Sequence, residues 1–423
     1  MFRWVPVAAL ALAACSFTPT GQGDESCQAR CDGPTAVTCP GGPDGEPVTM
    51  TCPALCIADP APRCASVTLA PSNLTASQAM TAQEASGALV INADVTIDTS
   101  LMAFVEPGTN DVVTFAGVEL VPLDAGRLLV AARTVSLAGG ATLYGRGDRA
   151  LILVAAETID LAGDVDFRPG CAPPSVNDLR CGGPGGGDGG RVGLAATGCA
   201  LGQAGSNGGG GAGGGNATQG GAGGVGTVAG APPRGLEMCN AGGDLEPLHG
   251  GSGGGAGAGP GADGGGGGGA LQLSAFGAIR IVGDGTAVLN LGGAGGQGAD
   301  DDGGGGGGSG GALLIEAPMV TILDARLLAA GGGGGSGRQA DDGQTARNDG
   351  TPAAGGASSS GGDGGGGAST AGVGGTGKDD TGGGGGGGGG LGPIRVLTAN
   401  PSFTLDDSVV VRGVFTSGPI NVR

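Results

Sequence analysis

Three long glycine-rich segments constrain what this chain can fold into. Residues 182–269, 292–311 and 331–392 contain 41, 13 and 30 of its 105 glycines. Glycine supplies no side chain to a core and loses more backbone freedom on folding than any other residue. The Val, Ile and Leu residues are concentrated in the sequence between these segments. The fold must therefore be built by the intervening sequence and must accept the glycine segments as insertions.

The intervening sequence contains a repeat. Residues 129–139 (LVAARTVSLAG) and 153–163 (LVAAETIDLAG) match at eight of eleven positions with an offset of 24. Looser copies begin at Leu89, Leu273, Leu313 and Val396, the last two only with a one-residue slip. Second short runs rich in β-branched residues and leucine follow at 141–144, 165–167, 287–291 and 326–329. Alternating apolar residues over such short runs predict β-strands.

A repeat of about 20–25 residues made of short strands is typical of a solenoid. We therefore expect an all-β parallel β-helix with two or three strands per coil, whose coils stack regardless of what is inserted at one corner. The alternative is an antiparallel β-sandwich. The expected organisation of the chain is signal peptide 1–14, tether 15–26, disulfide-rich segment 27–66, first coils 67–181, insertion 182–269, coil 270–291, insertion 292–311, coil 312–330, insertion 331–392 and last coil 393–423.

The glycine segments leave two structural alternatives open. A collagen helix is excluded because non-glycine residues such as Asn207 and Ala212 break the period of three. Flexible coil is one remaining alternative. The other is a bundle of polyglycine-II strands, whose interior needs glycine at nearly every position, as in 264–269, 303–308 and 382–390. In composition the segments resemble the glycine-rich tips of bacteriophage adhesins and some glycine-rich antifreeze proteins.

The N-terminus resembles that of bacterial lipoproteins. Arg3 precedes a short apolar run that ends in Leu12-Ala13-Ala14-Cys15, and this ending is similar to a lipobox. The resemblance implies cleavage before Cys15, lipidation of its thiol and anchoring through acyl chains. It predicts an exported protein of the cell envelope, at the outer membrane or cell surface. The chain also resembles glycine-rich, cysteine-containing surface lipoproteins of high-GC Gram-negative bacteria.

Ten further cysteines fit an exported protein. Six form a duplicated pattern with C-x3-C-x7-C spacing: Cys27, Cys31, Cys39, Cys52, Cys56 and Cys64. Each copy has an odd number, so full oxidation requires a bridge between the copies. Four more, Cys171, Cys181, Cys199 and Cys239, flank or lie within the first glycine segment and are candidates for disulfides that restrain it. No histidine lies near the six, and disulfides are favoured over a zinc site.

Charge and motifs give little indication of catalysis. The net charge is −19 and Lys378 is the single lysine, which argues against nucleic acid as a partner. His249 is the single histidine and lies in a glycine segment, and the sequence contains no nucleophile elbow or P-loop. Asp300, Asp301 and Asp302 are candidates for weak Ca²⁺ binding; solvated turn acids are the simpler interpretation. We expect no cofactor, no catalytic residue and no enzymatic activity.

These observations predict a lipid-anchored structural or interaction protein of the cell envelope. Its glycine-rich loops would contact a matrix, an extracellular polysaccharide or another surface protein, and its membrane contact would be the lipid anchor. The alternative is a polysaccharide lyase or hydrolase built on a β-helix. Three or more Asp, Lys or Arg side chains converging in a cleft on one strand face would favour the enzyme.

Overall fold

The computed structural model describes residues 27–32, 35–51, 56–57, 62–64, 69–108, 110–171, 178–226, 239, 244–259, 262–338, 341–368, 374–380, 382–399 and 403–421. The chain divides into two compact units, Met1–Ala65 and Ser66–Arg423. The expected signal peptide, Cys15 and the tether lie outside the described residues.

The first unit is a small antiparallel assembly. Strands β1 (Arg30–Asp32), β2 (Thr35–Thr38) and β3 (Val48–Thr51) form one sheet, and β4 (Cys56–Ile57) pairs with β5 (Arg63–Cys64). A disulfide joins Cys27 to Cys39, and Cys31 is also disulfide-bonded. With Cys27 and Cys39 joined to each other, the partner of Cys31 lies outside its own triplet. The first copy of the motif is therefore not closed by its own three cysteines.

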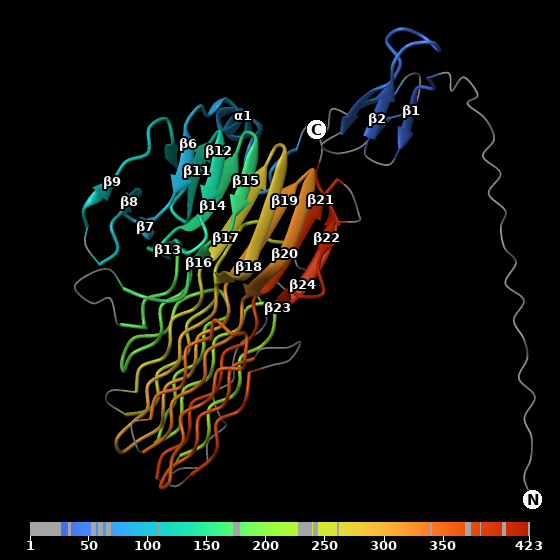
Figure 1. Ribbon diagram of the computed structural model, residues 1–423. Helices are drawn as coiled ribbons and strands as arrows, with labels where there is room; N and C mark the ends of the chain where they lie inside the picture. Colours follow the sequence, from blue (N-terminus) through green and yellow to red (C-terminus); the bar gives the residue numbers. More distant parts are fainter. Residues whose placement is uncertain are drawn as a thin grey trace, which may run out of the picture. The chain divides into compact units, whose positions relative to one another are not determined.

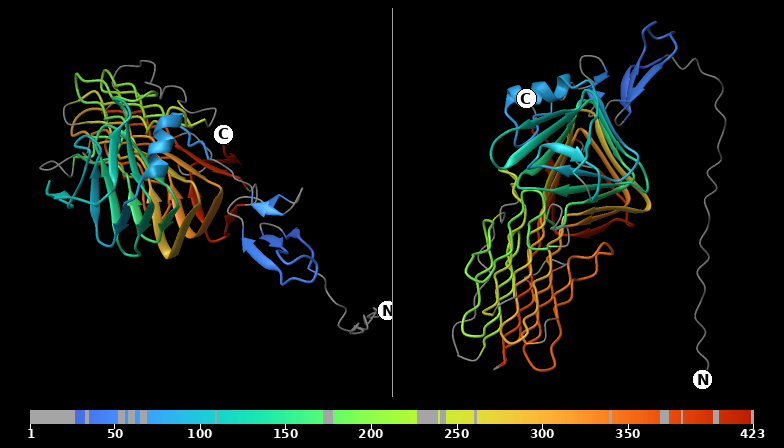
Figure 2. Two further views of the ribbon diagram at one scale, coloured as in Figure 1. Left: turned by 90° about the horizontal axis from the view of Figure 1, so that it is seen from above. Right: turned by 90° about the vertical axis from the view of Figure 1, so that its left-hand side faces the viewer.

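The second unit is built from three rows of parallel strands (Figures 1 and 2). The first row is β11 (Arg127–Ala132), β14 (Ala150–Ala155), β17 (Ala270–Ala275), β19 (Ala312–Ala317), β21 (Pro393–Thr398) and β24 (Val414–Pro419), with β10 (Glu119–Pro122) antiparallel at its start. The second row is β6 (Ala88–Ile91), β12 (Thr134–Leu137), β15 (Thr158–Leu161), the first parts of β18 (Ala278–Asn290) and β20 (Met319–Leu328), and β22 (Thr404–Leu405). The third row is β7 (Val95–Asp98), β13 (Thr142–Arg146), β16 (Asp164–Asp166), the last parts of β18 and β20, and β23 (Val410–Arg412), with β8 (Ala103–Val105) and β9 (Val112–Val113) antiparallel beside β7.

The main hydrophobic core lies between the three rows. Leu128 from the first row, Val135 from the second and Leu143 from the third are each buried in it, and the same inward positions recur along every row. Figure 2 shows the strands enclosing this core when the rows are seen end on. The expectation of an all-β fold is thus confirmed, with large sheets in which parallel pairing predominates.

The repeat aligns in space differently from the way it aligns in sequence. The second halves pair with the offset of 24, as Val135 does with Ile159. The first halves pair with an offset of 23, so that Leu129 lies opposite Ile152 and not opposite its identical partner Leu153. The physical reason is the corner, where one residue separates β11 from β12 and two residues separate β14 from β15. The identical leucines consequently face opposite sides of the sheet.

The outer face of the first row is buried as well. The only helix among the described residues, α1 (Ala76–Glu84), lies on this face with the segment before it, and Leu69, Leu74 and Ala82 pack there against Ile152. Thr75 caps the helix: its side chain accepts from the Gln78 backbone N–H, and Gln78 Oε1 accepts from the Thr75 N–H at 2.8 Å. This capping box was not recognised in the sequence, which led us to expect strands alone.

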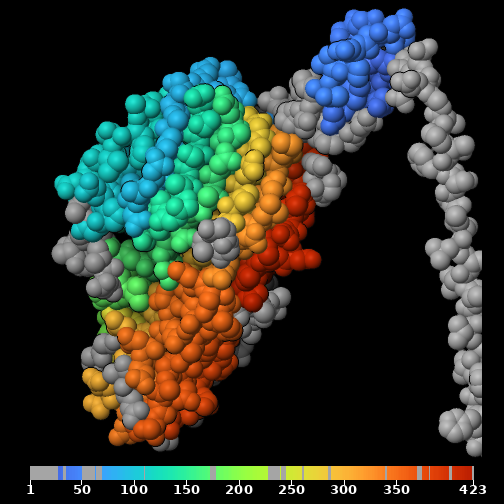
Figure 3. Space-filling view, in the orientation of Figure 1, coloured from blue at the N-terminus to red at the C-terminus, as the bar shows by residue number. Residues whose placement is uncertain are grey.

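The three glycine segments leave the strand rows on one side and form a layer of extended chains beside them (Figure 1). They enter β17, β19 and β21, three neighbouring strands of the first row. The space-filling view shows the layer closely packed, with the third segment (orange) covering most of this face (Figure 3).

Candidate functional sites: the glycine layer and the Tyr144 groove

The glycine run 382–390 lies at the centre of the layer, and its backbone N–H groups point in three directions in turn. Gly384, Gly387 and Gly390 donate to the carbonyls of Gly208, Gly211 and Gly214 at 2.8–2.9 Å. The residues between them donate to two other segments: Gly385 and Gly388 to Lys378 and Gly375, and Gly386 and Gly389 to Gly335 and Gly332, all at 2.8–2.9 Å. Every third residue therefore bonds the same neighbour.

The carbonyl groups of the run are used in the same way. Those of Gly384, Gly387 and Gly390 accept from 304, 307 and 310; those of Gly385 and Gly388 accept from 224 and 221; those of Gly386 and Gly389 accept from 365 and 368. These bonds measure 2.7–3.0 Å. The run thus donates to three segments and accepts from three different ones, so six chains surround it.

Side chains are excluded from this packing. A Cβ atom added to Gly386, Gly387 or Gly388 would overlap a backbone carbonyl of a neighbouring chain, and the same holds for most glycines of the layer. Glycine is required here because the chains approach backbone to backbone, whatever the conformation of each residue.

Small polar residues replace glycine where their side chains find partners. Asn216 is buried and its Nδ2 donates to the Gly310 carbonyl at 2.8 Å. Ser309 is buried, and its Oγ accepts from the Ser252 N–H at 2.8 Å and donates to the Gly215 carbonyl at 3.1 Å. The hydrogen bonds of these buried side chains replace those that they would make with water, so the layer accommodates them.

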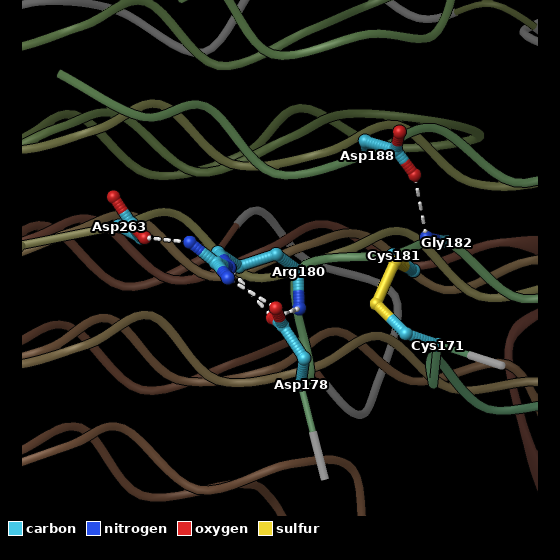
Figure 4. Close-up of a disulfide and its surroundings, with 7 residues drawn as sticks. All are labelled: Cys171, Asp178, Arg180, Cys181, Gly182, Asp188 and Asp263. Atoms are coloured by element: carbon cyan, nitrogen blue, oxygen red, sulfur yellow. Dashed lines mark hydrogen bonds and ion pairs between the residues drawn. A yellow bond between two sulfur atoms is a disulfide. The ribbon is translucent and has the colours of Figure 1, made fainter. Parts of the chain in front are cut away.

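Disulfides and ion pairs restrain the first glycine segment. Cys171 is joined to Cys181 and Cys199 to Cys239. Next to the first bridge, the Arg180 guanidinium binds Asp178 and also reaches Asp263 at 2.6 Å (Figure 4). The Arg180 hydrogen bond lowers the pKa of Asp178. Asp188 Oδ1 accepts from the Gly182 N–H at 2.9 Å, which fixes the chain just beyond the bridge.

A second candidate site is a cleft on the outer face of the third row, which we call the Tyr144 groove. Its floor is a line of outward residues on four adjacent strands, Thr96, Tyr144, Asp166 and Asn290, each directly opposite the next in the strand pairing. Tyr144, Asp166 and Arg168 line both a cavity of about 500 Å³ and an adjoining one of about 190 Å³. Strand spacing of about 4.8 Å makes this line roughly 14 Å long.

The walls of the groove come from two distant parts of the chain. Pro107 and Gly108, which precede β9, line it together with Pro169 and Leu179. Thr345 and Asn348, from the third glycine segment, complete the lining. Asn348 Oδ1 accepts from Asn290 Nδ2 at 2.7 Å, and its carbonyl accepts from Arg326 at 3.2 Å. The glycine layer and the strand row therefore build this site together.

The cationic side chains among the described residues lining the groove are ion-paired. Arg168 binds Asp166 through Nη2 at 2.6 Å and Nε at 2.9 Å, and this pairing raises the pKa of Arg168. Arg146 binds Asp98 at 2.7 Å, and both side chains are less than a tenth exposed. Asp164 accepts from the Val288 N–H at 2.9 Å, and partial burial raises its pKa.

A buried polar cluster lies on the outer face of the first row, under the segment that precedes α1. The Glu316 carboxylate is fully buried and accepts from the Ser72 N–H at 3.1 Å, from Gln272 at 2.9 Å and from Ser274 at 3.0 Å. Burial raises the pKa of Glu316. Gln272 also donates to the Ser72 carbonyl at 2.7 Å, so the cluster ties the N-terminal segment to the first row.

The aspartates of the glycine segments are placed as turn residues. Asp300, Asp301 and Asp302 occupy a bend and are exposed or half-exposed. Asp342 accepts from the Gly298 N–H at 2.9 Å, and Asp380 from the Gly382 N–H at 2.6 Å. Within the described ranges, no group of three or more His, Cys, Asp and Glu side chains is arranged to hold a metal ion. The structure does not gather the three calcium candidates with other ligands.

The remaining sequence-level sites divide into described and undescribed residues. His249 is exposed on the first glycine segment, away from the Tyr144 groove. Cys15 and Cys52 lie outside the described residues. In the part of the chain that the structure describes, no helix is long and apolar enough to span a bilayer. The Tyr144 groove was missed because its members lie far apart in sequence; the single tyrosine and the closely spaced D-x-D-x-R of 164–168 were the available signals.

Comparison with known proteins gives no match: neither family models, curated proteins nor solved structures show significant similarity to this chain.

Proposed function

We propose that this chain is a lipid-anchored protein of the cell envelope, in which a parallel β-helix carries an ordered polyglycine-II bundle that contacts a matrix or another surface. The three strand rows, each strand pairing with its counterpart from the next repeat, support the β-helix. The disulfides support an oxidising, extracytoplasmic location. The lipobox resemblance of residues 12–15 supports the anchor.

The observation that carries the proposal is the hydrogen bonding of the run 382–390. A polyglycine-II strand has threefold screw symmetry, so its N–H groups address three neighbours in rotation and its carbonyls three more. The donor and acceptor pattern of Gly384–Gly390 has this period and this number of neighbours. A layer of this kind presents a rigid surface poor in side chains, which suits contact with an extended polymer or a matrix.

Hydrogen exchange tests whether the bundle is ordered. The amides of Gly384–Gly390 donate within the bundle and are surrounded by other chains, so we expect them to exchange as slowly as those of the core strand β14. Those of the exposed turn around Gly139 should exchange quickly and serve as the internal reference. Uniformly fast exchange across all three glycine segments would contradict the ordered bundle.

Adhesion tests the role of the bundle. Cells that expose the chain should attach to a polysaccharide-coated surface more strongly than cells lacking it. Gly388→Val should abolish this gain, because its side chain would overlap the Gly366 carbonyl region. Gly139→Ala, in an open turn, is the matched control. Equal attachment by cells carrying the Gly388→Val and unchanged chains would contradict the proposed role.

The convergence of charged side chains that was expected for an enzyme is present in the Tyr144 groove, which is lined by Arg146, Asp164, Asp166 and Arg168. Asp164 and Asp166 lie on one strand face in a cleft, and burial raises the pKa of Asp164, as is required of a general acid near neutral pH. Asp166, however, accepts two hydrogen bonds from the Arg168 guanidinium and one from the Arg168 backbone N–H, and these occupy the oxygens that a nucleophile or base would use. This pairing favours binding over catalysis.

A further inference from the structure

We propose that the Tyr144 groove binds a neutral oligosaccharide and does not cleave it. This inference goes beyond the proposed function, since it concerns a different surface and depends neither on the lipid anchor nor on adhesion by the glycine layer. It rests on the size of the groove, the chemistry of its floor and the pairing of its charges.

The dimensions of the groove fit a short stretch of sugar chain. The main cavity is about 500 Å³ and continues past Asp166 into the adjoining cavity, so the site is elongated across the strands. Cavities in this range are typical of small-ligand sites. The roughly 14 Å of floor from Thr96 to Asn290 would accommodate more than one sugar ring.

The floor combines an aromatic ring with fixed polar groups. Tyr144 is half-exposed and offers a flat apolar surface with a hydroxyl at its edge, which matches the apolar face and hydroxyl rim of a sugar ring. Asp166 lies beside it in register and is partly exposed, together with its partner Arg168. Thr96 and Asn290 continue the floor on either side but are almost fully buried, and the Asn290 amide is already bonded to Asn348 and to the Gly292 N–H. The groups open to a sugar are therefore the Tyr144 ring and the Asp166–Arg168 pair.

The charges of the groove select against an anionic chain. Arg146 and Arg168 are the cations among the described lining residues, and each is already paired with an aspartate. Asp164 adds a carboxyl group to the adjoining cavity. A uronate or sulfate group would therefore meet no unpaired cation and would face a carboxylate. A neutral saccharide incurs no such penalty and can use the paired groups as oriented hydrogen-bond partners.

The rigid placement of these groups favours binding. Arg168 also donates to the Ala346 carbonyl at 3.4 Å, so the floor and the wall from the third glycine segment are connected. Asn290 is likewise bonded to Asn348 at 2.7 Å. Preorganised polar groups lower the entropic cost of binding.

The test uses the single tyrosine as the reporter. In the full chain carrying Trp4→Phe, Tyr144 is the only strongly emitting residue. We would titrate this chain with cellohexaose, maltohexaose, laminarihexaose and polygalacturonate, and follow the tyrosine emission, the heat of binding and the release of reducing ends. We expect at least one neutral hexasaccharide to produce a saturable change, with no effect of polygalacturonate and no reducing ends released.

Two pairs of variants locate the binding, and their affinities are compared by the heat of binding because the first pair lacks the reporter tyrosine. Tyr144→Ala should weaken binding about tenfold or more, as for other contact aromatics, whereas Tyr144→Phe keeps the ring and should retain most of the affinity. Asp166→Asn should weaken binding, whereas Asp160→Asn, on the exposed outer face of β15, should not. Thermal unfolding of each variant checks that it is folded.

Four results would overturn the proposal. They are the absence of binding by all three neutral hexasaccharides, preferential binding of polygalacturonate, equal affinity of the Tyr144→Ala and unchanged chains, and release of reducing ends. None of these results would alter the hydrogen-exchange experiment, so the order of the glycine bundle and sugar binding by the groove can fail separately. Because the adhesion surface carries polysaccharide, the Tyr144→Ala chain in the adhesion assay separates attachment through the groove from attachment through the glycine layer.

Discussion

At the scale of single residues, the glycine layer makes position 388 intolerant of any side chain. A Cβ at Gly388 would overlap the Gly366 carbonyl, and the neighbours there are backbone atoms that cannot rotate away. Gly388→Ala should therefore lower the free energy of unfolding by about 1–3 kcal/mol, the range for overpacking. Thermal or denaturant unfolding measures this change.

Gly139→Ala is the control for this prediction. Gly139 is exposed, and the nearest atom to an added Cβ is the Ala162 carbonyl oxygen at 3.8 Å. This substitution should leave stability within about 0.5 kcal/mol. If both variants unfold alike, the close packing of the run 382–390 is wrong.

Glu316 should give the protein a measurable pH dependence. Burial raises its pKa in the folded state, so the folded protein holds this proton at pH values where the unfolded chain has released it. The contribution of this group is therefore fully favourable below the ordinary pKa of glutamate and is lost as the pH rises from there through the raised pKa. The free energy of unfolding should fall over that window.

Glu316→Gln replaces the titrating carboxyl group by a neutral amide of similar shape. Chemical denaturation of the variant across the same window should show a flatter profile than that of the unchanged chain, with the difference in slope confined to this range. Glu157→Gln, an exposed substitution at the corner before β15, should leave the profile unchanged. Parallel profiles for all three chains would show that the pKa of Glu316 does not differ between the folded and unfolded states.

At the scale of elements, the two disulfides of the second unit should stabilise it unequally. Cys199 and Cys239 are 40 residues apart in sequence, and Cys171 and Cys181 are 10 apart. The chain-entropy treatment gives the longer loop the larger effect, by about 1 kcal/mol. Replacing both members of each pair by serine should therefore lower the melting temperature more for the 199–239 pair, as scanning calorimetry would show. The reverse order would indicate that the loop of the first pair is the more important restraint.

The elements also show what sequence alone could predict. The short strands and their parallel stacking follow from alternating apolar residues and the internal repeat, both of which are local signals. The one-residue shift in register between β11 and β14 could not be predicted. It depends on the number of residues at the corner after each strand, and the sequences of the two repeats still align without a gap. Helix α1 had a local signal in its capping box, but its apolar contacts are made with a distant strand row.

The functional surfaces were less predictable because they are formed by contacts between residues that are distant in sequence. Glycine runs such as 382–390 indicated that side chains could not fit, but the partners of their N–H groups come from three other stretches of chain and those of their carbonyls from three more. Similarly, Thr96, Tyr144 and Asn290 become neighbours only through strand pairing. The sequence indicated which residue types form these surfaces, whereas the pairing of distant chain segments determines how those residues are arranged in space.

At the scale of the whole molecule, the composition bears on how the chain is held at a membrane. The net charge is −19 and Lys378 is its single lysine, so the protein has little electrostatic attraction to an anionic bilayer. Stable anchoring needs more than one acyl chain or one chain with a basic patch. The proposed attachment therefore depends entirely on the acyl chains of a lipidated Cys15.

Removal of the lipidated cysteine should accordingly abolish membrane attachment completely. Cys15→Ser should move the protein from the membrane fraction to the soluble fraction, with no residual salt-sensitive pool, because a chain of net charge −19 with one lysine has little attraction to anionic lipid. Ser16→Ala changes the adjacent residue while retaining the thiol, and should leave the protein membrane-bound. Fractionation followed by immunoblotting at low and high salt measures both variants. Retention of the Cys15→Ser chain in the membrane fraction would show that the lipobox resemblance is misleading and that another part of the molecule holds it there.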